Sequence, residues 1–194
     1  MLTKAALRTA LPVGALALLL AGCGPDNDPG AEPSGAPAAA KGTFDAPLAW
    51  KTPADASATT YGTHETVRLG VTPVSVVKGD AAAVDKLSTG VVQGRVPYYV
   101  TVTFSHKGGP EDIGAYVHGV ALHSDAEHAY GYLPSWGVDF PPCQEGDGEA
   151  RRLTPGKSVT TCEIFLLPAN AQPVFLAYKG SDEKGDVQAV WKVG

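Results

Sequence analysis

The sequence predicts an all-β fold, an antiparallel β-sandwich of about seven to nine short strands. Apolar and polar residues alternate along several segments, as they do in a strand with one buried and one exposed face. Clusters of turn-forming residues such as HKGGPED, TPGK and KGSDEKGD separate these segments. No amphipathic helix of any length is predicted, because only DAAAVDKLS has helical character and it is short.

The alternation is clearest in YYVTVTFS. It assigns to one buried face Tyr98, Val100, Val102 and Phe104, and to the opposite face Tyr99, Thr101, Thr103 and Ser105. The same period predicts buried positions at Val67, Leu69 and Val71, and near the C-terminus at Val187, Ala189, Trp191 and Val193. Further strands are predicted at residues 74–78, 116–123, 128–133, 158–167 and 174–178.

The N-terminus has the pattern of an export signal. Lys4 and Arg8 flank the apolar stretch TALPVGALALLL, which is shorter than the roughly 18 to 20 residues of a membrane-spanning helix. The following LAGC at residues 20–23 resembles the lipobox of bacterial lipoproteins, in which the cysteine thiol receives a diacylglyceryl group and a peptidase cuts before it. The resemblance implies lipid attachment at Cys23 and a place at the cell membrane, facing outside the cytoplasm. The alternatives are an ordinary secretory signal and an uncleaved membrane anchor.

The composition changes after Cys23. Residues 24–60 are dominated by Gly, Pro, Ala, Asp and Ser and have little apolar periodicity, so a disordered tether is expected, from which Trp50 could pack back onto the domain. The chain therefore divides into a removed signal peptide (1–22), a lipidated N-terminus and linker (23–60) and a folded domain (61–194).

The mature chain is acidic. Without Lys4 and Arg8, 13 of the 15 basic side chains remain against 20 acidic ones, a net charge of about −7. This charge argues against nucleic acid as a partner and against electrostatic attachment to anionic lipid.

The assignment of Cys23 to lipid attachment decides which cysteines can pair. With Cys23 lipidated, Cys143 and Cys162 remain, and outside the cytoplasm such a pair is expected to form a disulfide. Two free thiols or a two-cysteine metal site are the alternatives, although metal sites usually use more closely spaced pairs.

The strand order carries a second resemblance. PYYVTVTF, VALHSDAEHAYGY, LTPGKSVTTCEIFLLPANAQPVFLAY and AVWKV follow one another as in the immunoglobulin-like domains of actinobacterial secreted antigens and their lipoprotein relatives. The resemblance covers most of residues 61–194 and implies an immunoglobulin-like sandwich. It also implies a non-catalytic binding or interaction module, whose partner could be an extracytoplasmic protein, a glycan or a small molecule. The resemblance identifies no functional residue in this sequence.

Motifs for catalysis and cofactors are incomplete. PGKS lacks the first glycine of a phosphate-binding loop, because Arg151 stands there. EGDGE lacks the glycine and the last glutamate of a calcium loop. No G-x-S-x-G nucleophile elbow occurs. We therefore expect neither an enzyme nor a cofactor.

Two groups of side chains are candidates for a site. His118, His123 and His128 recur every five residues, and imidazole suits zinc or copper. His123 and His128 could face each other across a hairpin, so a metal-handling lipoprotein is the alternative function, although His118 has the opposite parity to His123. The second group is aromatic and could form either core or a binding surface: Tyr116, Tyr130, Tyr132, Trp136 and Phe140.

Overall fold

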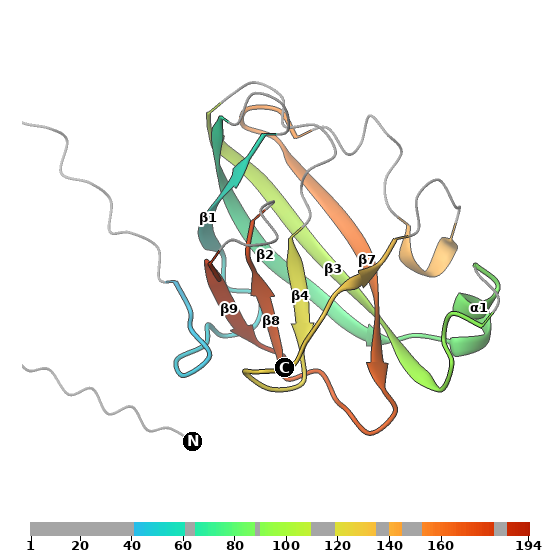
Figure 1. The fold of residues 1–194 in the computed structure, drawn as a ribbon. Helices are drawn as coiled ribbons and strands as arrows, with labels where there is room; N and C mark the ends of the chain where they lie inside the picture. The colour runs from blue at the N-terminus through green and yellow to red at the C-terminus, as the bar shows by residue number, and fades with distance from the viewer. Residues whose placement is uncertain are drawn as a thin grey trace, which may run out of the picture. The chain divides into compact units, whose positions relative to one another are not determined.

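The computed structural model describes residues 41–60, 65–87, 90–109, 119–134, 140–144, 153–180 and 186–194. Within them the chain is nearly all β and forms two antiparallel sheets, one of five strands and one of four (Figure 1). The predicted all-β sandwich is therefore confirmed. The predictions for the signal peptide, for Cys23 and for residues 24–40 lie outside the described residues.

The five-stranded sheet has the order β1-β2-β3-β7-β6. Its strands are β1 (Ala54–Thr59), β2 (Thr66–Lys78), β3 (Arg95–Gly108), β7 (Ser158–Pro168) and β6 (Tyr132–Leu133). The four-stranded sheet has the order β5-β4-β8-β9. Its strands are β5 (Ala129–Tyr130), β4 (Val120–His123), β8 (Phe175–Tyr178) and β9 (Ala189–Lys192). Two short helices accompany the sheets, α1 (Ala81–Asp85) and the 3-10 helix η1 (Pro141–Cys143).

Strands β2 to β9 have immunoglobulin-like connectivity. In that fold strands A, B, E and D form one sheet and C, F and G the other, and variable-type domains add C′ beside C. The orders β2-β3-β7-β6 and β5-β4-β8-β9 reproduce this arrangement in chain order, with β5 as C′. β1 is an additional strand beside β2. The predicted immunoglobulin-like sandwich is confirmed.

The folded domain begins before residue 61, so the predicted tether is wrong for residues 41–60. β1 pairs with β2 from Ala54↔Val71 to Thr59↔Thr66. The Leu48 N–H donates to the Val190 carbonyl at 2.9 Å, and the Lys192 N–H donates to the Leu48 carbonyl at 2.9 Å. Composition misled the prediction because β1, ADASAT, consists of small and polar residues, and its place is decided by pairing with β2 rather than by its own hydrophobicity.

The main core lies between the sheets. The predicted inner face of β3 is confirmed, since Tyr98, Val100, Val102 and Phe104 are all buried in it. From the other sheet it receives Leu122, Leu176, Tyr178, Ala189 and Trp191. Val187, predicted to be buried with Trp191, is instead 37% exposed, because β9 starts only at Ala189.

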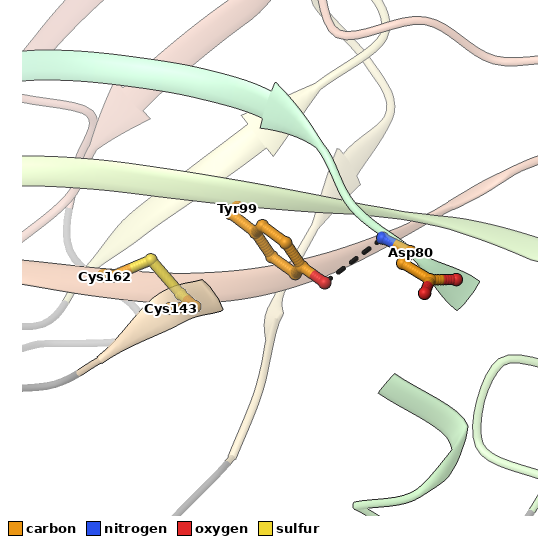
Figure 2. The surroundings of a disulfide bond; sticks show 4 residues. All are labelled: Asp80, Tyr99, Cys143 and Cys162. Atoms are coloured by element: carbon orange, nitrogen blue, oxygen red, sulfur yellow. Dashed lines mark hydrogen bonds between the residues drawn. A yellow bond between two sulfur atoms is a disulfide. The ribbon is translucent and has the colours of Figure 1, made fainter. Parts of the chain in front are cut away.

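A second apolar cluster covers part of the outer face of the five-stranded sheet. Its members are Val84, Val92, Tyr99, Phe140, Cys143, Cys162, Ile164 and Leu166. α1 and η1 provide the cover, so the outer face of β3 is dry at Tyr99, contrary to the alternation-based prediction. The Tyr99 ring meets Phe140 edge-on at 5.6 Å, and its hydroxyl accepts a hydrogen bond from the Asp80 N–H at 3.2 Å (Figure 2).

The predicted disulfide is confirmed and belongs to this second cluster. Cys143 in η1 is bonded to Cys162 in β7, with the two Cα atoms 5.3 Å apart (Figure 2). The bond is not the one of antibody domains, which joins strands B and F across the core. It fastens the connection between β6 and β7 to the outer face of a sheet.

Candidate functional site

A groove lies at one end of the sandwich, between the β4–β5 turn and the β7–β8 connection, which Figure 1 draws together at its lower end. We call it the end groove. It has a volume of about 510 Å³. The β4–β5 hairpin contributes Ser124, Asp125, His128 and Tyr130, and the connection contributes Pro168, Asn170, Ala171, Gln172 and Val174.

The β4–β5 wall is organised by Asp125. Its Oδ1 accepts hydrogen bonds from the N–H groups of Glu127 (2.9 Å) and His128 (2.8 Å), the local pattern that makes aspartate a turn residue. The Nδ1 of His128 lies 2.8 Å from the same oxygen and 2.9 Å from Oδ2. The Ser124 N–H donates to the His128 carbonyl at 3.3 Å and closes the turn.

Asp125 and His128 form an exposed ion pair when the imidazole is protonated. The hydrogen bond from His128, followed by those from the two N–H groups, lowers the pKa of Asp125 to about 2. The hydrogen bond to Asp125 raises the pKa of His128 above 6.5. The side chains of His128 and Asp125 are 66% and 53% exposed, so solvent screens the pair and its role is to orient the imidazole rather than to stabilise the fold.

The opposite wall is held by bonds to the body of the domain. The hydroxyl of Tyr98 in β3 donates a hydrogen bond to Gln172 Oε1 at 3.2 Å. This bond does not use the amide nitrogen of the Gln172 side chain. The Val174 N–H donates to the His123 carbonyl at 2.7 Å and ties this connection to the end of β4. Within the β4–β5 wall, the Tyr130 hydroxyl lies 3.3 Å from Ser124 Oγ.

The aromatic candidates separate into different places. Tyr130 lines the end groove, as a binding-surface residue would, and is also partly buried against the main core. Tyr132 packs against the main core and Phe140 lies in the second cluster. Tyr116 and Trp136 lie outside the described residues. The sequence analysis missed Asn170 and Gln172, because PANAQP was recognised only as a turn and nothing in it indicated which segment it would face.

The histidine pair does not form the expected cross-strand arrangement. His123 pairs with Ala129 instead of His128, and a shift of one residue turns a side chain toward the other face. His123 is 3% exposed and its ring lies 4.8 Å from that of Phe44, whereas the imidazole of His128 faces solvent. His118 lies outside the described residues, and among the described ones no group of three or more His, Cys, Asp or Glu could hold a metal ion.

His123 is a buried imidazole in an apolar setting. Neither of its ring nitrogens has a hydrogen-bond partner within the described part of the chain. Burial lowers its pKa below 6.5, and the charge of Lys179 adds to this, while Asp125 partly offsets it. The folded state therefore favours the neutral form of the His123 imidazole.

We expect the domain to lose stability as the pH falls from about 6.5 through the lowered pKa of His123, because the unfolded chain then binds a proton that the folded chain excludes. Above pH 6.5 this contribution is complete. His123→Phe should reduce this loss of stability, measured as the difference between the midpoints of urea unfolding at pH 7.5 and at pH 5. His128→Gln is the control with the opposite sign: its pKa is raised, so its removal should leave the acid loss intact or steeper. An unchanged pH dependence in His123→Phe would assign the loss to other groups.

The groups of a serine hydrolase are present in the end groove, but their connections differ from those of a catalytic triad. In a triad the imidazole lies between the serine and the carboxylate. Here Ser124 Oγ contacts Asp125 Oδ2 at 3.5 Å and the Tyr130 hydroxyl at 3.3 Å, and no hydrogen bond joins it to His128. The Ser124 hydroxyl is therefore not placed as the nucleophile of such a triad.

No protein-family profile, curated protein or solved structure matches this chain. Within the described residues, no helix is both long and apolar enough to cross a membrane. The fold places the chain in the class of immunoglobulin-like β-sandwiches, with one disulfide outside the main core.

Proposed function

We propose that this protein is a non-catalytic, lipid-anchored binding module that faces outside the cytoplasm and takes its ligand in the end groove. The observation that carries the proposal is the groove itself. Its volume of about 510 Å³ falls within the range of small-molecule sites, and it combines one aromatic ring with several oriented polar side chains. The groove is built from loops on a rigid sheet scaffold, where binding residues are often found. It lies at the end opposite to the loops that bind in variable-type immunoglobulin domains, because its walls are the C–C′ turn and the E–F connection.

The location rests on two independent features. The LAGC sequence and the apolar stretch before it favour lipid attachment at Cys23. The Cys143–Cys162 disulfide favours an oxidising compartment, because cytosolic thiols are kept reduced. The first supports a membrane anchor, and both support a location outside the cytoplasm.

Cys23→Ser should abolish lipid attachment and move the protein from the detergent phase to the aqueous phase on phase separation, because the acyl chains provide the membrane affinity. Cys143→Ser with Cys162→Ser is the matched control, since it replaces the two other cysteines, which form the disulfide, and should leave the partition unchanged. If Cys23→Ser still entered the detergent phase as the wild type does, another part of the chain would be the anchor.

The ligand-binding part is tested by photo-crosslinking in intact cells. A photoreactive amino acid at Asn170, exposed in the end groove, should give adducts that the same group at Lys157 does not give. Lys157 is the control because it is equally exposed and precedes β7, whereas Asn170 follows it, so the two positions lie at opposite ends of that strand. Adducts identified by mass spectrometry only at Asn170 support the groove, and identical adducts at both positions would contradict it.

A further inference from the structure

The charges of the end groove select against ionic ligands. Among the nine described residues that line it none is Lys or Arg, so a phosphate or carboxylate would find no free cation among them. Its one carboxylate, Asp125, already accepts from two N–H groups and the His128 imidazole. A cationic ligand would therefore compete with three existing donors, and a neutral ligand meets neither difficulty.

Three main-chain N–H groups of the groove walls are engaged within the domain. The Ser124 N–H donates to His128, the Ala171 N–H to Pro168 and the Val174 N–H to His123. A peptide that binds by adding a strand needs a row of unpaired main-chain groups. β5 is an edge strand with one unpaired side, but its two residues are too few for such a row, which disfavours a peptide bound as an added strand.

The side chains that remain suit a polyhydroxylated molecule. Asn170 and Gln172 carry planar amides, Ser124 and Tyr130 carry hydroxyls, and His128 carries an oriented imidazole. Sugar hydroxyls both donate and accept, so they can match this mixture, whereas the C–H face of a sugar ring is apolar and packs on an aromatic ring. Tyr130 supplies that ring.

From these three observations we propose that the end groove binds a neutral saccharide, held by Asn170, Gln172 and the Asp125–His128 pair and packed on Tyr130. The assignment rests on the proposed binding function and specifies its ligand class. The volume of about 510 Å³ accommodates a short oligosaccharide rather than a single sugar.

The test is isothermal titration of the full chain in detergent with defined probes. The neutral probes are linear trisaccharides of glucose, mannose and N-acetylglucosamine. The contrasting probes are trigalacturonate, the trimer of glucosamine and a neutral alanine tripeptide. At least one neutral trisaccharide should bind saturably, and the three contrasting probes should bind more weakly.

Asn170→Ala and Gln172→Ala should each weaken the binding of that trisaccharide about 3- to 10-fold, the effect of losing one neutral hydrogen bond. Both side chains are exposed, so neither variant is expected to unfold, and the melting temperature of Asn170→Ala should be unchanged. Gln172→Ala also removes the acceptor of the Tyr98 hydroxyl and should melt somewhat earlier, so its binding is measured well below its melting temperature. Lys157→Ala is the control and should bind as the wild type does.

Two results would overturn the saccharide assignment. One is the absence of saturable binding of every neutral trisaccharide up to about 10 mM. The other is tighter binding of a charged sugar or of the tripeptide. If Gln172→Ala weakens that tighter binding, the ligand class is wrong and the groove remains the binding site. Identical crosslinks at Asn170 and Lys157 would instead contradict the proposed function itself.

Discussion

Replacing Trp191 with alanine should lower the free energy of unfolding by about 3 to 5 kcal/mol, the largest effect expected of any single substitution in this domain. Trp191 lies in β9 and is 0% exposed, so truncation leaves a cavity in the main core. Its indole N–H also donates to the Thr52 carbonyl at 2.7 Å, which holds the segment before β1. The domain therefore loses packing and one tertiary hydrogen bond together.

Urea unfolding of three variants checks this expectation. Trp191→Phe keeps most of the apolar volume and should cost less than Trp191→Ala. Val187→Ala is the matched control just before β9, where the side chain is 37% exposed, and it should cost about 0.5 kcal/mol or less. If Trp191→Ala were as mild as Val187→Ala, β9 would not be packed into the sandwich.

Removing the disulfide should have the second-largest effect, up to about 3 kcal/mol. Cys143 and Cys162 are separated by 19 positions, and the bond restricts that loop in the unfolded chain. Both cysteines are also buried in the second cluster, beside Tyr99 and Phe140, so their release loosens the cover of this face. Such a loss is large compared with the roughly 5 to 15 kcal/mol of a typical domain.

The melting temperature with and without reductant measures the effect. The reduced wild type should melt earlier, and the double variant Cys143→Ala, Cys162→Ala should melt early in both conditions. Titration of thiols in the denatured, exported protein without reductant should find none from this pair. Two reactive thiols, or a reductant effect that persists in the double variant, would contradict the role given to the bond.

Several features follow from local sequence because their cause is local. The alternation in YYVTVTFS places Tyr98, Val100, Val102 and Phe104 on one side of any strand, whatever strand lies next to it. The disulfide is not local, but it could be predicted because Cys143 and Cys162 are the two cysteines that remain once Cys23 is assigned to lipid attachment. The turn at Asp125 forms because an aspartate side chain reaches N–H groups two and three residues later.

Other features depend on contacts between segments distant in sequence. β1 is too poor in large apolar residues to be predicted alone, and its partner in β2 decides it. Tyr99 is buried only because η1 and α1 cover it. His123 and His128 lie apart because the β4–β5 register places Ala129 opposite His123.

The end groove shows the division most clearly. The residue pattern was enough to predict the class of fold, the inner face of β3, the two cysteines of the disulfide and Tyr130 as a candidate binding residue. The tertiary structure alone decided that Asn170 and Gln172 stand opposite Asp125 and His128, because β4 pairs with β8 and so brings together two connections more than forty positions apart. Which strands pair in a sandwich depends on contacts between segments distant in sequence, and no hydrophobic pattern within either connection predicts it.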